Sequence, residues 1–212
     1  MTIKNETDIC IRLREADRRR DWCEMSDLLD EATREDIKKL KPLIPELLEH
    51  RHFLVRTSAV ELIEDFNLRS LTHLAQARLA DRNALVRSYA LMAYSRVAGA
   101  KALSEIAKGA DDKDVGVRVT ALVLSYVKTR DKNALEKLRK TLRRKTCRDS
   151  YRESTLRMFD LYMKGKPGVL VVKLYEEILP LISACGVLED MRGILNAWKQ
   201  PPKGRAPSRP AK

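Results

Sequence analysis

Glycine, proline and aromatic residues are all scarce in this chain. Its 212 residues include eight glycines and eight prolines, and aromatic side chains make up 5%. A fold of many strands needs turn residues at short intervals, so this composition disfavours one. Leu, Ala, Arg, Lys and Glu are abundant instead, which is typical of helices. Since 44% of the residues are apolar, the chain can build a core, and we predict an all-α fold.

Long apolar runs are absent as well. The longest one, residues 178–188, is shorter than the roughly 20 residues needed to cross a membrane. It is also interrupted by Pro180, Ser183 and Gly186. Residues 1–6 contain no apolar signal region. These absences lead us to expect a cytoplasmic protein without a membrane contact.

Positive charge is concentrated in two stretches. The formal net charge is +12, yet residues 1–127 carry 21 basic and 21 acidic side chains. Residues 128–148, here called the basic segment, carry ten basic and two acidic side chains, and residues 199–212 carry five basic and none acidic. The last stretch has four prolines and no large apolar residue. We therefore expect 199–212 to be a disordered basic tail.

A short motif recurs every 31 residues. Val-Arg-Thr-Ser-Ala at 55–59 returns as Val-Arg-Ser-Tyr-Ala at 86–90 and as Val-Arg-Val-Thr-Ala at 117–121. A weaker fourth copy, Tyr-Arg-Glu-Ser-Thr at 151–155, follows after 34 residues. Apolar residues around each copy have helical spacing, so each unit predicts a pair of antiparallel helices. Because one pair cannot bury its own apolar faces, we expect the pairs to stack.

Two units place an aspartate five residues ahead of the motif, at Asp81 and Asp112. This pattern, an aspartate followed by Val-Arg and then Ala-Leu, resembles the short HEAT repeats found in phycobilin lyases. His50 and Thr146 replace the aspartate in the first and fourth units. The resemblance implies a right-handed α-solenoid of four to six stacked helical hairpins. Its expected parts are capping helices at 1–35, HEAT-like repeats at 36–164 and a C-terminal capping pair at 165–198.

The same resemblance implies a structural role for the arginine of each motif. In HEAT-like proteins this arginine bonds to the aspartate of its own or a neighbouring unit. We therefore expect the motif arginines to hold the turns together rather than to form a basic ladder for a ligand. They are Arg56, Arg87, Arg118 and Arg152.

Patterns typical of catalysis and metal binding are missing. The chain has no H-E-x-x-H sequence, no P-loop and no G-x-S-x-G. His50 and His52 fit a solvated turn, and the acids at 111–114 lack the spacing of a calcium loop. The four cysteines form no C-x-x-C pair and fit free thiols in a reducing compartment, with a disulfide as the less favoured alternative. We expect no cofactor, no metal and no catalytic residues.

The basic segment is the first candidate binding surface. Helical spacing places its apolar residues on one face and its charges on the other. The exposed charges fit a contact with phosphates or with an acidic partner; the alternative is a solvated helix face. The segment has no aromatic residue for stacking bases, which argues against sequence-specific binding of nucleic acid. Its candidate contact residues are Lys137, Lys140, Arg143, Arg144, Lys145 and Arg148.

The concave face of the expected solenoid is the second candidate. The resemblance places one residue of each motif helix in this groove, and an apolar strip there would hold a segment of a partner protein. The alternative is that these apolar residues are buried between neighbouring helices. The candidate residues are Glu61, Met92, Val123 and Arg157, with Tyr126 one turn further on.

Three classes of function remain open at this point. The sequence favours a non-enzymatic HEAT-repeat protein that binds another protein as an adaptor, an assembly factor or a toxin-neutralising immunity protein. The second class binds the nucleic-acid backbone through 128–148 and the tail. The third is a HEAT-like enzyme such as an alkylbase DNA glycosylase, a family that uses tryptophan and aspartate at the damaged base. Here the tryptophans, Trp22 and Trp198, lie outside the clear repeats.

Overall fold

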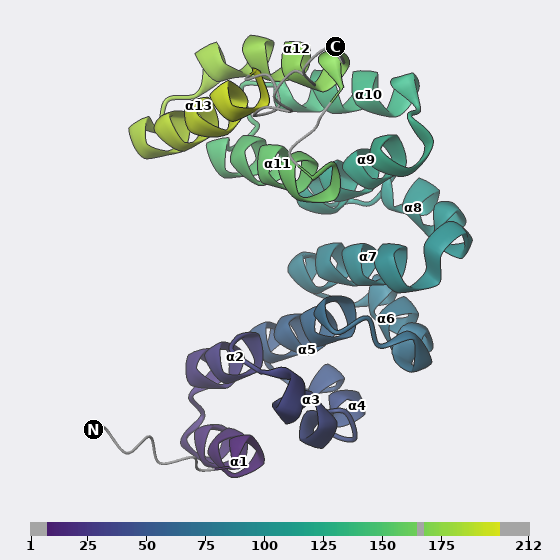
Figure 1. The fold of residues 1–212 in the computed structure, drawn as a ribbon, viewed down its shortest axis with the longest axis vertical. Helices are drawn as coiled ribbons and strands as arrows, with labels where there is room; N and C mark the ends of the chain where they lie inside the picture. Colours follow the sequence, from purple (N-terminus) through teal and green to yellow (C-terminus); the bar gives the residue numbers. More distant parts are fainter. Residues whose placement is uncertain (1–7, 165–167, 200–212) are drawn as a thin grey trace, which may run out of the picture. The chain divides into compact units, whose positions relative to one another are not determined.

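The structure is a computed structural model, and it describes residues 8–164 and 168–199 (Figure 1). All regular secondary structure in these residues is helical, without a strand. The predicted all-α class is therefore confirmed for this part of the chain. The expected disordered tail falls outside the described residues except for Lys199, which ends the last helix.

The chain forms two compact units, residues 1–124 (unit 1) and 125–212 (unit 2). The division between them falls within helix α9 (Val115–Thr129). The other described helices of unit 1 are α1 (Ile9–Arg19), α2 (Trp22–Asp30), α3 (Arg34–Leu40), α4 (Ile44–Leu48), α5 (Phe53–Asp65), α6 (Thr72–Ala77), α7 (Ala84–Ala98) and α8 (Leu103–Gly109). Those of unit 2 are α10 (Lys132–Leu142), α11 (Asp149–Tyr162), α12 (Val169–Ile178) and α13 (Cys185–Lys199). Short 3₁₀ turns lie at Arg69–Leu71, Arg78–Ala80, Gly99–Ala102 and Leu179–Leu181.

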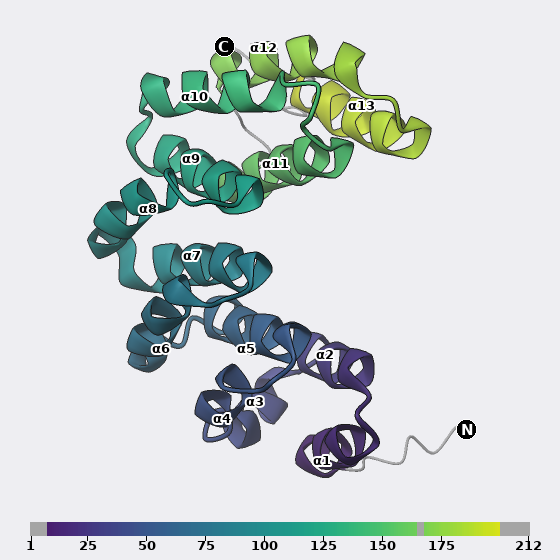
Figure 2. The same cartoon turned by 180° about the vertical axis from the view of Figure 1, so that it is seen from behind.

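The recurring motif lies in the first turns of α5, α7 and α9. In unit 1, α5 packs against α7, and α2 packs against α5 (Figures 1 and 2). Helix α4 contacts α5, and α6 contacts α7. The apolar positions of the motif are buried in all three copies, as the helical period predicts: Val55, Ala59, Val86, Ala90, Val117 and Ala121.

Arginine–aspartate pairs connect the turns that precede these helices. Arg56 donates from Nε and Nη2 to the two carboxylate oxygens of Asp81, both at 2.8 Å. Arg87 donates in the same way to Asp112, at 2.9 and 2.8 Å. The Arg56 and Asp81 side chains are only 5% and 4% exposed. The expected structural role is confirmed for these two arginines.

The two pairs are joined into one hydrogen-bonded chain through the backbone. Arg87 Nη1 donates to the carbonyl oxygen of Asp81 at 2.9 Å, and Arg118 Nη1 donates to that of Asp112 at 2.6 Å. The hydrogen bonds from Arg87 hold the pKa of Asp112 below its usual value, against the opposing effect of burial. The carboxylates therefore stay ionised and keep each turn attached to the next.

Unit 2 is organised around a row of aromatic rings. Tyr126, Phe159, Tyr175 and Trp198 make successive edge-to-face contacts, with ring centroids 6.0, 6.2 and 6.0 Å apart. Phe159 and Tyr175 are fully buried. The row links α9, α11, α12 and α13, and α11 lies beside α13 (Figures 1 and 2). It forms the aromatic part of the core of unit 2.

The buried pair Arg56–Asp81 gives the first prediction. Asp81→Asn keeps the shape of the side chain but leaves the guanidinium of Arg56 buried without a counter-ion, which costs about 3–5 kcal/mol. Hydrogen exchange of the α5 and α7 amides should accelerate accordingly. The matched control is Glu35→Gln, because the Glu35–Lys38 pair is 80% and 71% exposed and such pairs contribute less than about 1 kcal/mol. Equal effects of the two substitutions would contradict a structural role for the buried pair.

Candidate functional site

The basic segment forms one face of α10 and the turn that leads to α11. Helix α10 begins at Lys132, where the Asp131 carboxylate accepts a hydrogen bond from the Asn133 N–H at 2.8 Å. Its inner face is apolar and buried, through Ala134, Leu135, Leu138 and Leu142. All six predicted contact residues are exposed on the outer face and the turn, which confirms the predicted exposure: Lys137, Lys140, Arg143, Arg144, Lys145 and Arg148.

Most of these charges have no counter-ion. Glu177 lies 3.5 Å from Arg139 and 3.8 Å from Arg143, and Glu136 lies 3.1 Å from Arg139. Within the described residues, the other five cations make no ion pair: Lys137, Lys140, Arg144, Lys145 and Arg148. The surface therefore presents a positive charge that the fold does not neutralise.

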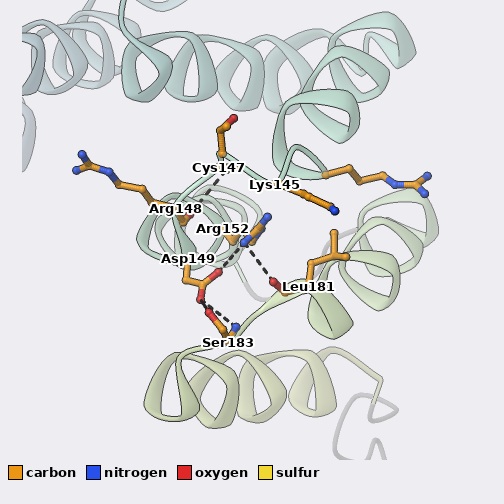
Figure 3. A pocket seen from close by; sticks show the side chains of 9 residues that line it. Lys145, Cys147, Arg148, Asp149, Arg152, Leu181 and Ser183 are labelled. Atoms are coloured by element: carbon orange, nitrogen blue, oxygen red, sulfur yellow. Dashed lines mark hydrogen bonds and ion pairs between the residues drawn. The ribbon is translucent and has the colours of Figure 1, made fainter.

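An open cavity of about 390 Å³ lies at this turn, lined also by Leu181 and Ser183. The buried Arg152 lies at its base, and Figure 3 shows Lys145 and Arg148 extending to opposite sides of Arg152. The Cys147 thiol is buried at the wall, and burial raises its pKa. The exposed cations are thus spread around the rim rather than directed at a single point.

Arg152 and Asp149 hold this turn in place. Arg152 donates to the carbonyl oxygens of Leu142 and Arg144, at 3.0 and 3.1 Å, and to Asp149 Oδ1 at 2.5 Å. The second carboxylate oxygen of Asp149 accepts hydrogen bonds from Ser183 N–H, Ser183 Oγ and Ala184 N–H, at 3.0, 2.9 and 3.1 Å (Figure 3). Because Arg152 and Asp149 are bonded to other groups of the protein, they hold the walls of the cavity in place.

Burial opposes the ionisation of Asp149, but these hydrogen bonds outweigh it. The N–H groups of Ala184 and Ser183, the Ser183 hydroxyl and Arg152 together hold the Asp149 pKa below its usual value. The carboxylate therefore remains charged and anchors the start of α13 to the start of α11. This role of Asp149 was not predicted, because Ser183 lies 34 residues away and no motif marks the contact.

Similar cavities accompany the paired arginines of unit 1. One of about 530 Å³ lies at Arg56 and one of about 350 Å³ at Arg87. The cavity at Arg56 contains Glu49 and Asp81, and the one at Arg87 contains Glu105 and Asp112. The cavity at Arg152 is lined by three further cations and by a single acid, Asp149. The excess of positive charge around the cavity at Arg152 distinguishes it from the two cavities of unit 1.

The expected apolar strip is wrong at two of its three residues. Val123 is completely buried and Tyr126 is 5% exposed, while Met92 is half-buried. Helix α9 is buried continuously from residue 119 to residue 124, so it has no apolar side left for a partner. The Tyr126 ring is used in the aromatic row of unit 2.

Glu61 and Arg157, the polar candidates of the concave face, differ in their surroundings. Glu61 is half-buried, and burial together with the charges of Asp30, Asp65 and Glu64 raises its pKa to about 7. Arg157 is exposed and pairs with Glu153 and Asp190, at 2.8 and 2.9 Å.

The two histidines at 50 and 52 are only partly exposed, which corrects the expectation of a fully solvated turn. Their rings pack on Trp22, with centroids 5.1 and 5.7 Å away. The guanidinium of Arg51 covers the same indole at 4.5 Å. In unit 2, the indole N–H of Trp198 donates to Asp160 at 2.6 Å. Each tryptophan is therefore part of the packing of its unit.

Within the described residues, no cluster of three or more side chains has the composition of a metal site. No helix in the same ranges is both long and apolar enough to cross a bilayer. Comparisons with protein-family models, with curated proteins and with solved structures found no match.

The raised pKa of Glu61 gives the second prediction. The folded state binds this proton more tightly than the unfolded state, whose glutamate pKa is 4.5. The stabilising effect is complete below that value and is lost as the pH rises through about 7. Glu61→Gln imitates the protonated form of the side chain. It should leave the free energy of unfolding unchanged under acid conditions. In mild alkali it should raise the free energy of unfolding by about 1–2 kcal/mol, after allowance for partial exposure.

Urea denaturation on both sides of neutral pH would measure this difference. Glu46→Gln is the control, because Glu46 is exposed and makes no ion pair within the described residues. An equal effect of Glu61→Gln at both pH values would contradict the inferred environment of Glu61.

Proposed function

We propose that this chain is a non-enzymatic binding protein made of HEAT-like repeats, and that its basic segment contacts the phosphate backbone of nucleic acid. The repeat assignment is supported by the 31-residue recurrence of the motif and by the two identical arginine–aspartate pairs. A right-handed stack of four to six hairpins is part of the same proposal. The uncompensated cations of 128–148 carry the assignment of the target.

Counter-ion release favours binding of a polyanion to this surface. Each phosphate neutralised by a lysine or arginine releases condensed counter-ions, which favours binding at low salt. Five of the six candidate cations on α10 and its following turn make no ion pair within the described residues. Because neighbouring acids do not have to be displaced, the full charge is available to a polyanion. Arg143 has a weaker claim, since Glu177 lies 3.8 Å away.

The arrangement of the cations fits an extended anion. Lys137 and Lys140 are separated by about one helical turn, and Lys145 and Arg148 extend to opposite sides of Arg152 (Figure 3). Charges spread in this way match successive phosphates of a backbone better than one small ion. The segment has no aromatic residue, so the proposed binding reads charge and not base sequence.

The sequence favoured a protein partner, and that preference depended on an exposed apolar strip. Burial of Val123 and Tyr126 removes this support. The backbone-binding function now ranks first for unit 2.

Fluorescence anisotropy with labelled duplex DNA at about 50 and 200 mM salt tests the proposal. Wild-type affinity should fall steeply between the two salt concentrations. Replacing four of the candidate cations with Glu should lower the affinity by about 100-fold or more. The slope of log affinity against log salt concentration should decrease by the amount expected for about four phosphate contacts. The four residues are Lys137, Lys140, Lys145 and Arg148.

The matched control carries the same charge change on unit 1, through Arg34, Lys41, Lys101 and Lys113, which are exposed and make no ion pair within the described residues. At the higher salt concentration its affinity should change little, since these four residues are not part of the proposed contact surface and salt screens charges that do not touch the phosphates. Binding should also survive removal of residues 203–212. Absence of salt-dependent binding, or an equal loss in both quadruple variants, would overturn the proposal.

A further inference from the structure

Three arginines of unit 1 are anchored in the same way. Nη1 of each donates to two consecutive backbone carbonyls in the turn before its own helix. The distances are 2.8 and 3.2 Å for Arg56, 2.9 and 3.4 Å for Arg87, and 2.6 and 2.9 Å for Arg118. This anchor fixes the plane of each guanidinium and directs its remaining edge, Nε and Nη2, away from the turn.

Two of these edges hold a carboxylate. Arg56 and Arg87 each bind both oxygens of an aspartate that lies 25 residues further along the chain. Two parallel N–H···O bonds of this kind are among the strongest and most directional that proteins form. The edge of an anchored motif arginine is therefore a carboxylate site, used twice in this chain.

The third edge is open. The residue 25 positions after Arg118 is Arg143, which cannot act as an acceptor. No described side chain bonds to Nε or Nη2 of Arg118, and neither atom is buried without a partner. Arg56 and Arg87 are 4% and 6% exposed, whereas Arg118 is only partly buried.

Asp112 and Asp114, which precede Arg118 in the chain, have their carboxylates bonded elsewhere. The carboxylate of Asp112 holds Arg87, and Asp112 supplies only its backbone oxygen to Arg118. The carboxylate of Asp114 accepts hydrogen bonds from Gly116 N–H and Val117 N–H at the start of α9, at 2.8 and 3.3 Å.

We propose that the open edge of Arg118 binds the carboxylate of an acidic side chain on a protein partner. The two filled copies define the ligand, since both hold an aspartate side chain in the geometry that Arg118 offers. The anchor to Asp112 and Lys113 fixes the guanidinium before the ligand arrives, so little side-chain entropy is lost on binding. The partner would thus supply the aspartate that the chain lacks at position 143.

Nitrogen–proton correlation spectra of the arginine Nε–H groups test this in the full chain. The probe is a blocked tetraglutamate peptide, with acetate as a second carboxylate. The Arg118 signal, identified by its loss in Arg118→Lys, should shift saturably in the millimolar range. The Arg56 and Arg87 signals serve as internal controls and should stay in place, because their edges are occupied.

A phosphate monoester and duplex DNA are titrated in parallel. If Arg118 responds to them and not to the carboxylates, the occupant is a nucleic acid and the proposal is wrong. It is equally overturned if Arg118 does not respond to any probe, or if Arg56 and Arg87 shift as much as Arg118. Arg118→Lys should abolish the specific response while leaving the Arg56 and Arg87 signals unchanged, which excludes loss of folding as the cause.

Discussion

A buried arginine–aspartate pair is the interaction on which the rest of unit 1 depends. The guanidinium of Arg56 holds Asp81, whose backbone oxygen anchors Arg87, and Arg87 holds Asp112 in turn. Charges this deeply buried are stable only when they are fully hydrogen-bonded, so each turn requires the next one to be in place. The apolar faces of α5 and α7 are brought together by the same arrangement.

The chain of pairs ends at Arg118, and the surfaces proposed for binding begin there. Beyond it, the turn between α10 and α11 carries cations where the earlier turns carry acids. Arg152 instead pairs with a local acid, Asp149, which lies three residues before it. In the earlier repeats the motif arginine is paired with an aspartate of the chain. In the later repeats the corresponding position is either unpaired, as at Arg118, or surrounded by cations, as at Arg152. Both proposals of binding follow from this single change of charge, one toward phosphates and one toward a carboxylate.

Helical class, burial of the apolar motif residues and exposure of the six candidate cations of the basic segment were all predictable. Each of these properties depends on residues within one or two helical turns. The pairing of Arg56 and Arg87 with an aspartate was implied by the resemblance of the motif to HEAT repeats. Predictions failed where a side chain had neighbours on every side. Val123 and Tyr126 lie in or next to the stretch of α9, residues 119–124, that is buried continuously. The histidines at 50 and 52 pack on an indole from α2.

Local patterning was therefore sufficient for which segments are helices and which of their faces carry charge. Tertiary structure alone decided which charges are neutralised. Asp149 is bound by groups 34 and 35 residues away, and Glu177 lies near Arg139 and Arg143 although it is on a different helix. Ion pairing depends on distances of a few ångströms between residues far apart in the chain. Periodicity carries no information about such distances unless the repeat itself supplies the partner, as it does for Asp81 and Asp112.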